Sequence, residues 1–289
     1  MPLTPTIGVF DSGFGGLTVL RALVARLPHA HFAFIGDTAR LPYGSKSRRT
    51  ISRYAVESAQ FLVREQGAEF LVIACNTASA LALDAIQAAV PVPVLGVIEP
   101  GAANARASSR TDDVLVIATD ATVHSHAYAA ACSALGLRAL EKACPLLVPL
   151  VEEGWTNHPV TEQVIRVYLD ELLSTAKAEG MNPDTLVLGC THYPLLRPLI
   201  ERAVPAGMKV IDSAESAADA AAQLIKGHGL PGSTESAGAD QAKVGSESDS
   251  INPASIRCFA TDSVEKFEHL GSRFLGRPVG NVELVDLGG

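Results

Sequence analysis

The chain has 289 residues, of which 47% are hydrophobic, and a formal net charge of −8 at pH 7. This length provides a large core in one or two domains, and an acidic chain without a basic block is not expected to bind nucleic acid or an anionic membrane surface. No signal-peptide pattern opens the chain and no apolar run reaches the roughly 18 to 20 residues that cross a bilayer, so we expect a cytoplasmic protein.

Short apolar runs rich in β-branched residues alternate with helical patterns along the chain. Apolar residues keep helical spacing from Leu17 to Leu27 and again from Leu195 to Ala203, and Ser213 marks the start of a third helix. This alternation predicts an α/β fold with mostly parallel sheets and helices on both faces. The predicted strands are TIGVF (6–10), HFAFIG (31–36), EFLVIA (69–74), VPVLGV (92–97), DVLVIA (113–118), TLVLG (185–189) and MKVID (208–212).

The segment 231–250, PGSTESAGADQAKVGSESDS, interrupts this alternation. Its single large apolar residue is Val244. Such a composition cannot bury enough apolar surface to hold one conformation, so we expect a mobile polar loop.

Two local patterns occur twice. FLVIACNTASALAL (70–83) and TLVLGCTHYPLL (185–196) share the order strand, cysteine, threonine, helix, while IGVFDSGFGG (7–16) and VLVIATDATVHS (114–125) each end a strand in a polar cluster. Ligands of open α/β sheets bind beyond the carboxyl ends of the strands. We therefore predict two lobes of like construction, each of which presents one cysteine to a common cleft.

The cysteines are Cys75, Cys132, Cys144, Cys190 and Cys258. Their odd number and wide spacing argue against a disulfide framework and a zinc site, so we expect free thiols and no bound metal. A thiol at a strand end that opens a helix lies near unpaired N–H groups, which lower its pKa from about 8.5 to roughly 3.5–7.5. Two such thiols facing one stereogenic carbon can remove a proton from one side and deliver one to the other, which is racemisation.

Other interpretations remain open at this point. A nucleophilic cysteine with His192 as its base leaves the second cysteine unexplained, and a redox pair normally has CxxC spacing. The cluster DSGFGG with Asp37 weakly matches a dinucleotide-binding fingerprint, although Thr18 replaces the third glycine. A regulatory role in binding a partner protein is a further alternative.

Four motifs in order, IGVFDSGFGGLTVL, DTARLPYG, CNTASA and GCTHYPLL, resemble those of the glutamate racemases, and the similarity runs from Ile7 to about Asp286. The resemblance implies a two-lobed α/β enzyme that converts L-glutamate to D-glutamate for peptidoglycan biosynthesis without a cofactor. It also implies a homodimer and leaves open an activating cell-wall precursor. An aspartate or related amino-acid racemase stays an alternative, because the sequence does not reveal the depth of the side-chain pocket.

The resemblance further implies which residues act. Cys75 and Cys190 would be the acid and base, assisted by Asp11, His192 and Glu152. The first lobe would comprise 1–98 and 208–289, and the second 99–207. Substrate contacts would come from Asp11, Ser12, Tyr43, Gly44, Asn76, Thr77, Thr119, Thr191 and His192.

Overall fold

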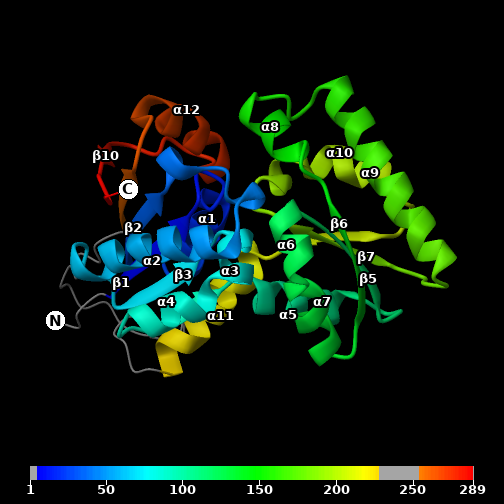
Figure 1. The fold of residues 1–289 in the computed structure, drawn as a ribbon, viewed down its shortest axis with the longest axis horizontal. Coiled ribbons are helices and arrows are strands. Elements are labelled where there is room, and N and C mark those ends of the chain that lie inside the picture. The colour runs from blue at the N-terminus through cyan, green and yellow to red at the C-terminus, as the bar shows by residue number, and fades with distance from the viewer. Residues whose placement is uncertain (1–4, 228–253, 289) are drawn as a thin grey trace, which may run out of the picture.

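The computed structural model describes residues 5–227 and 254–288, so the predicted polar loop at 231–250 lies outside the described residues. The chain forms two lobes, each built around its own sheet (Figure 1). The first lobe contains the N-terminal strands together with the C-terminal elements, and the second contains the middle of the chain. Within the described ranges, no helix has the length and apolar character needed to span a membrane.

All strand pairings in the described sheets are parallel. The first sheet has the order β10 (Val282–Leu284), β9 (Ser255–Ala260), β2 (His31–Gly36), β1 (Thr6–Asp11), β3 (Phe70–Ile73) and β4 (Val94–Gly96). The second has the order β6 (Arg138–Ala143), β5 (Asp113–Ala118), β7 (Thr185–Gly189) and β8 (Lys209–Asp212).

The two sheets repeat one topology. The order β2-β1-β3-β4 in the first sheet corresponds to β6-β5-β7-β8 in the second, with β9 and β10 added beyond β2. Strands β1 and β5 are therefore equivalent, and so are β3 and β7, as the duplicated sequence patterns predict. The two cysteines that follow β3 and β7 thus occupy equivalent positions in the two lobes.

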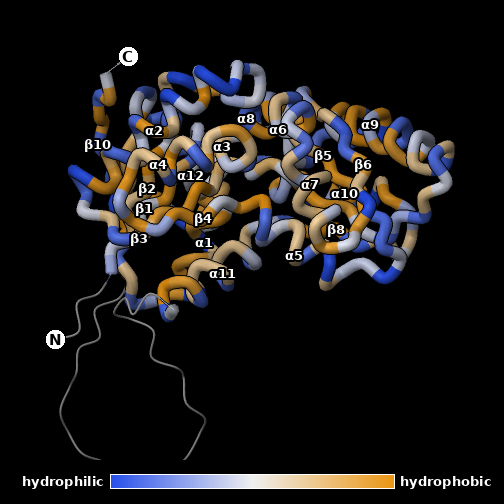
Figure 2. Tube along the Cα trace, turned by 60° about the horizontal axis from the view of Figure 1, so that its bottom comes forward, coloured by the Kyte–Doolittle hydropathy of each residue, from blue (hydrophilic) through white to orange (hydrophobic). Residues whose placement is uncertain are grey.

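Helices cover both faces of each sheet, which explains why the strands are nearly continuous apolar runs. Phe32 and Phe34 pack with α1, α11 and α12, whereas Ala33 and Ile35 point to the opposite face and pack with α2 and α4. In the second lobe, α8, α9 and α10 cover one face of the sheet and α5 and α7 the other. Figure 2 shows the hydrophobic strands inside these layers.

The helices are short on average, and three single turns of 3₁₀ helix lie near the strand ends. The α-helices are α1 (Leu17–Arg26), α2 (Arg48–Arg64), α3 (Asn76–Leu81), α4 (Leu83–Ala89), α5 (Ile98–Ser108), α6 (Asp120–Ser125), α7 (Ala127–Ala134), α8 (Leu147–Glu152), α9 (Pro159–Ala178), α10 (Arg197–Ala203), α11 (Ala214–Gly227) and α12 (Val264–Leu275). The 3₁₀ turns are η1 (Thr38–Arg40), η2 (Tyr43–Ser45) and η3 (Tyr193–Leu196).

The structure corrects two details of the sequence interpretation. The predicted return to the first lobe at 208 falls one strand too early, because β8 pairs with β7 in the second sheet. By sheet membership, the chain crosses back after Asp212. The strands β6, β9 and β10 were also not predicted. β6 is largely polar (RALEKA), β9 (SIRCFA) begins with polar residues, and β10 is a three-residue edge strand.

Helix α12 is anchored to the first lobe by Phe267, a buried residue whose ring contacts those of Phe14 and Phe34 edge-on. We expect Phe267→Ala to lower the free energy of unfolding by about 3–5 kcal/mol, because the substitution leaves a cavity among aromatic rings. Leu284→Ala is the control, since Leu284 is 65% exposed. Chemical denaturation of both variants checks this, and equal losses would contradict the packing role of Phe267.

Candidate active site

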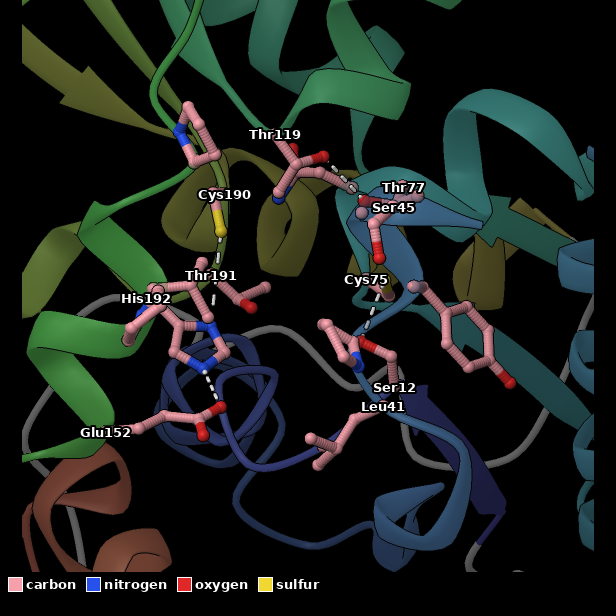
Figure 3. A pocket seen from close by; sticks show the side chains of 18 of the residues that line it. Ser12, Leu41, Ser45, Cys75, Thr77, Thr119, Glu152, Cys190, Thr191 and His192 are labelled. Atoms are coloured by element: carbon pink, nitrogen blue, oxygen red, sulfur yellow. Dashed lines mark hydrogen bonds and ion pairs between the residues drawn. The ribbon is translucent and has the colours of Figure 1, made fainter. Parts of the chain in front are cut away.

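A cavity of about 360 Å³ lies between the lobes and is lined by the residues that directly follow β1, β3, β5 and β7. Every residue predicted from the sequence as a site residue lines it except Asp11. Figure 3 shows the side chains of Cys190, His192 and Glu152 on one side of the cavity and those of Ser12 and Cys75 on the other. The four polar strand ends therefore do meet at one cleft, as predicted.

Cys75 is the N-cap residue of α3 and is buried, with its sulfur accepting from the backbone N–H of Ala78 at 3.5 Å. Its thiol donates to Ser12 Oγ at 3.4 Å. Burial raises the pKa of Cys75 to about 12, and the negative charge of Asp11 acts in the same direction. The prediction of a low pKa at this helix start is therefore wrong for Cys75, because burial and a nearby carboxylate outweigh the hydrogen bonds to sulfur.

Cys190 has a different environment. It does not open a helix as predicted, because η3 begins only at Tyr193 and α10 at Arg197. Its sulfur instead lies 4.0 Å from Nδ1 of His192, and Nε2 of the same ring lies 3.3 Å from Oε1 of Glu152. A line of three polar groups therefore runs from the sulfur to the carboxylate.

The charges along this line support one another. Burial opposes the charged imidazole, but Cys190 and Glu152 outweigh it and raise the pKa of His192 to about 10. Burial also opposes the Glu152 carboxylate, yet His192 and Lys266 hold the pKa of Glu152 below its usual value. Lys266 belongs to α12 of the first lobe and donates to Oε2 of Glu152 at 3.4 Å. At neutral pH, His192 is thus an imidazolium between two groups that favour its charge.

Asp11 ends β1 and is buried behind the residues that line the cavity. One carboxylate oxygen accepts from the backbone N–H of Gly13 at 2.9 Å, and the other accepts a long hydrogen bond of 3.5 Å from Thr191 Oγ1. Burial raises the pKa of Asp11, although the charge of His192 acts against this. Asp11 does not line the cavity and influences it through its charge, whereas the sequence predicted a substrate contact for this residue.

Three threonine hydroxyls join the lobes beside the cavity. Oγ1 of Thr77 in the first lobe lies 2.9 Å from Oγ1 of Thr119 and 3.3 Å from Oγ1 of Thr122, and the last two are 2.9 Å apart. Next to them, Asn76 Oδ1 accepts from the hydroxyl of Tyr128 at 2.7 Å. Hydroxyl and amide groups of this kind can hydrogen-bond a carboxylate.

Tyr43 lines the cavity with its ring, but its hydroxyl is engaged by Asp37. The Asp37 carboxylate is fully buried and also accepts from Arg40 Nε and Thr261 Oγ1 at 2.9 Å each. The nucleotide-binding interpretation needs this carboxylate to face a ribose. Since its partners are all protein groups in a buried network, the structure does not favour that interpretation.

Gly15, which belongs to the DSGFGG motif, and Gly44, a predicted substrate contact, allow the lobes to approach each other closely. A Cβ atom on Gly15 would lie 2.2 Å from Oγ1 of Thr191 and 2.7 Å from Nδ1 of His192. A Cβ atom on Gly44 would lie 2.8 Å from Cβ of Thr119. These glycines thus serve contact between the lobes, not the cradling of a phosphate.

Sequence reasoning missed part of the site. Lys266, Tyr128 and Thr122 contact predicted site residues from outside the cavity wall. Their positions depend on the three-dimensional fold, so local sequence patterns do not reveal them. No group of three or more His, Cys, Asp or Glu side chains that could hold a metal occurs in residues 5–227 and 254–288. Further lining residues that were not predicted as site residues are Gly13, Leu41, Pro42, Ser45, Asp120, Pro145, Val148, Pro149 and Glu153.

Comparison with known proteins decides the family. The family model described as Asp/Glu/Hydantoin racemase matches residues 7–221. A glutamate racemase of Koribacter versatilis (strain Ellin345) is 55% identical over 99% of this chain and 98% of its own length. The chain belongs to the glutamate racemase family. It is accordingly an isomerase.

Solved glutamate racemases have the same architecture. The enzyme from Francisella tularensis in complex with D-glutamate superposes with a TM-score of 0.83 at 34% identity, covering 98% of each chain. The Escherichia coli glutamate racemase in complex with L-glutamate and the activator UDP-MurNAc-ala superposes with a TM-score of 0.74 at 26% identity, covering 99% of this chain and 100% of that one. The two-lobed α/β fold of this racemase is therefore that of its family.

We expect Gly15→Ala to reduce racemase activity by about 100-fold or more, because the added methyl group displaces Thr191 and His192 and a shift of about 1 Å at a site has effects of this size. Gly227→Ala is the matched control, since no described atom lies within 4 Å of its added Cβ. Steady-state kinetics of both variants are the measurement. Unchanged activity of the Gly15 variant would contradict the close approach of the lobes.

We expect Glu152→Gln to lower the pKa of His192 below about 10, because the variant loses the carboxylate that favours the imidazolium. A raised pKa stabilises the folded state fully below the unfolded pKa of about 6.5, and this stabilisation is lost as pH rises through the folded pKa. In the variant the loss still begins near the unfolded pKa but should be smaller and complete at a lower pH. An NMR titration of the histidine rings tests this, with His192→Asn to assign the signal.

The opposite result is informative as well. A His192 signal that titrates at the same pH in the Glu152→Gln variant and in the unmodified chain would show that the carboxylate does not support the imidazolium.

Proposed function

We propose that this chain interconverts L-glutamate and D-glutamate with Cys75 and Cys190 as acid and base on opposite faces of the α-carbon. One observation carries the proposal: the two cysteines follow equivalent strands of the repeated lobes and line the same cavity from both sides. Their common site is what a two-base reaction needs. The similarity to glutamate racemases, one of them solved with D-glutamate, supports glutamate as the substrate.

The unlike surroundings of the two sulfurs support a division of roles. Cys75 is buried beside Asp11 and keeps its proton, so it acts as the general acid. The imidazolium of His192 lies 4.0 Å from the sulfur of Cys190 and favours negative charge there, which makes Cys190 the base. In this proposal, the reaction therefore begins with Cys75 as the thiol and Cys190 as the thiolate.

The proton balance of the reaction follows. The Cys190 thiolate takes the α-proton, and the electron pair of the broken C–H bond remains on the α-carbon and spreads into the carboxylate. The Cys75 thiol then gives its proton to the opposite face of the same carbon. The product is the other enantiomer, with Cys190 as thiol and Cys75 as thiolate, and reversal of each step returns the substrate.

The developing negative charge on the substrate carboxylate needs hydrogen-bond donors. Asn76, Thr77 and Thr119 provide amide and hydroxyl groups on the cavity wall, and such donors stabilise charge most effectively where water is excluded. This group therefore lowers the barrier to proton removal. A racemase of this kind acts on the free amino acid, and we assign its product, D-glutamate, to peptidoglycan biosynthesis. We also propose, from the family resemblance, that the chain acts as a homodimer.

Deuterium exchange tests the two-base mechanism. In deuterium oxide and without added cofactor, each enantiomer of glutamate should give a product that carries deuterium at the α-carbon while the remaining substrate keeps its proton. The physical reason is that the removed proton stays on one sulfur while the delivered deuterium comes from the other. Early product that retains the original α-proton would instead indicate a single base.

Substitution of each cysteine gives an independent test. We expect Cys75→Ser and Cys190→Ser to lower kcat/KM by about 10²–10⁴-fold each, the range of a general acid or base. Cys258→Ala is the control, because Cys258 is buried in β9 away from the cavity. Full activity of either serine variant would refute the two-base assignment.

A panel of substrates distinguishes glutamate from the alternative amino acids. Optical rotation followed with glutamate, aspartate and neutral amino acids in turn should change only with glutamate. Preferential turnover of aspartate would assign the chain to the alternative racemase class while leaving the thiol pair intact.

A further inference from the structure

Tyr128 makes a buried contact between the lobes directly behind the cavity. It lies in α7 of the second lobe and has no exposed surface. Its hydroxyl donates to Oδ1 of Asn76, in the first lobe, at 2.7 Å. Asn76 itself is the first residue of α3, directly after Cys75, and lines the cavity. A residue outside the cavity wall thus controls a polar group on that wall.

This hydrogen bond has a direction. The phenol of Tyr128 is the donor and the amide oxygen of Asn76 is the acceptor, because an amide oxygen has no hydrogen to donate. The bond therefore links α7 of the second lobe to an amide at the start of α3 in the first lobe.

The direction fixes which end of the Asn76 amide faces the cavity. An amide oxygen that accepts from Tyr128 places the two N–H groups of Nδ2 on the other side. Within the described residues, Nδ2 makes no hydrogen bond to a protein group, and it is not among the fully buried side-chain atoms that lack a partner, so it keeps accessible surface on the cavity that Asn76 lines. A ligand acceptor in the cavity would satisfy its N–H groups.

We propose that Tyr128 is a positioning residue, which holds the Asn76 amide so that Nδ2 donates to a carboxylate oxygen of the amino-acid substrate. The proposal rests on the proposed function and adds to it a residue from outside the cavity. Without the phenolic proton, the amide is free to rotate, and its oxygen would then face the substrate carboxylate and repel it. The hydroxyl of Tyr128 therefore acts on substrate affinity through Asn76.

Tyr128→Phe removes the hydroxyl and keeps the ring. We expect KM for both enantiomers to rise about 3- to 10-fold, the size of one net hydrogen bond, while kcat changes less than about twofold, because the contact is made to substrate and transition state alike. L- and D-glutamate have equal free energies, so kcat/KM must fall by the same factor in both directions. This equality checks the quality of the kinetic data.

A double-mutant cycle separates positioning from mere structural support. In an Asn76→Ala background, Tyr128→Phe should have no further effect on kcat/KM, because the amide through which it acts is absent. Ser109→Ala is the matched control. Ser109 is buried and donates a 2.8 Å hydrogen bond to Asp184 at the far end of the second sheet, so its loss should lower stability and leave KM unchanged.

Three results would overturn the proposal. The first is an unchanged KM in Tyr128→Phe, and the second is an equal loss of kcat/KM in both backgrounds, which would mean that the tyrosine only supports the fold. The third is a rise in KM for Ser109→Ala that matches the one for Tyr128→Phe. If the unmodified chain does not racemise glutamate in the same assay, the proposed function fails instead, so the two failures are distinguishable.

Discussion

The charge on His192 is the feature on which the asymmetry of the site depends. A buried imidazolium is costly unless negative groups accompany it, and here Glu152 lies 3.3 Å from one ring nitrogen and Cys190 lies 4.0 Å from the other. Lys266 holds the second oxygen of Glu152 from the opposite lobe, and the ring of Phe274 on the same helix packs edge-on against the imidazole. The protonation of the site therefore depends on α12 of the first lobe meeting α8 of the second.

The repeated topology of the lobes determines where the two thiols lie, and the residues around each thiol determine its acid–base properties. Cys75 and Cys190 follow equivalent strands, which places them on opposite sides of the cavity. Cys75 lies buried beside the carboxylate of Asp11, which disfavours a thiolate, whereas Cys190 lies 4.0 Å from the imidazole of His192. An exactly symmetric pair would have two acids or two bases, so the unlike neighbours are as important to a racemase as the repeat itself.

Most of the strands and the cavity residues could be predicted from the sequence because, in parallel α/β folds, both produce local sequence patterns. Apolar runs such as FLVI need burial on both faces, and the polar residues after them must then lie at the carboxyl edge of a sheet. Charge environments are not local in this sense. The pKa of Cys75 was predicted wrongly because burial of the thiol, and in addition the charge of Asp11 at the end of a different strand, oppose the thiolate. Lys266 and Tyr128 were not predicted because they lie on helices that are distant in sequence from the residues they contact. Strand β6 was not predicted because its side chains are largely polar.

The asymmetry also bears on turnover under the proposed mechanism. A turnover that begins with the Cys190 thiolate ends with a proton on Cys190 and negative charge on Cys75. Burial and Asp11 both disfavour that form, and the reverse reaction consumes it directly. A second turnover in the same direction instead needs a proton to return to Cys75, where Ser12 is the hydrogen-bonded side chain that reaches the cavity. Sustained turnover in one direction therefore requires, besides the chemistry at carbon, that this proton distribution be restored after every cycle.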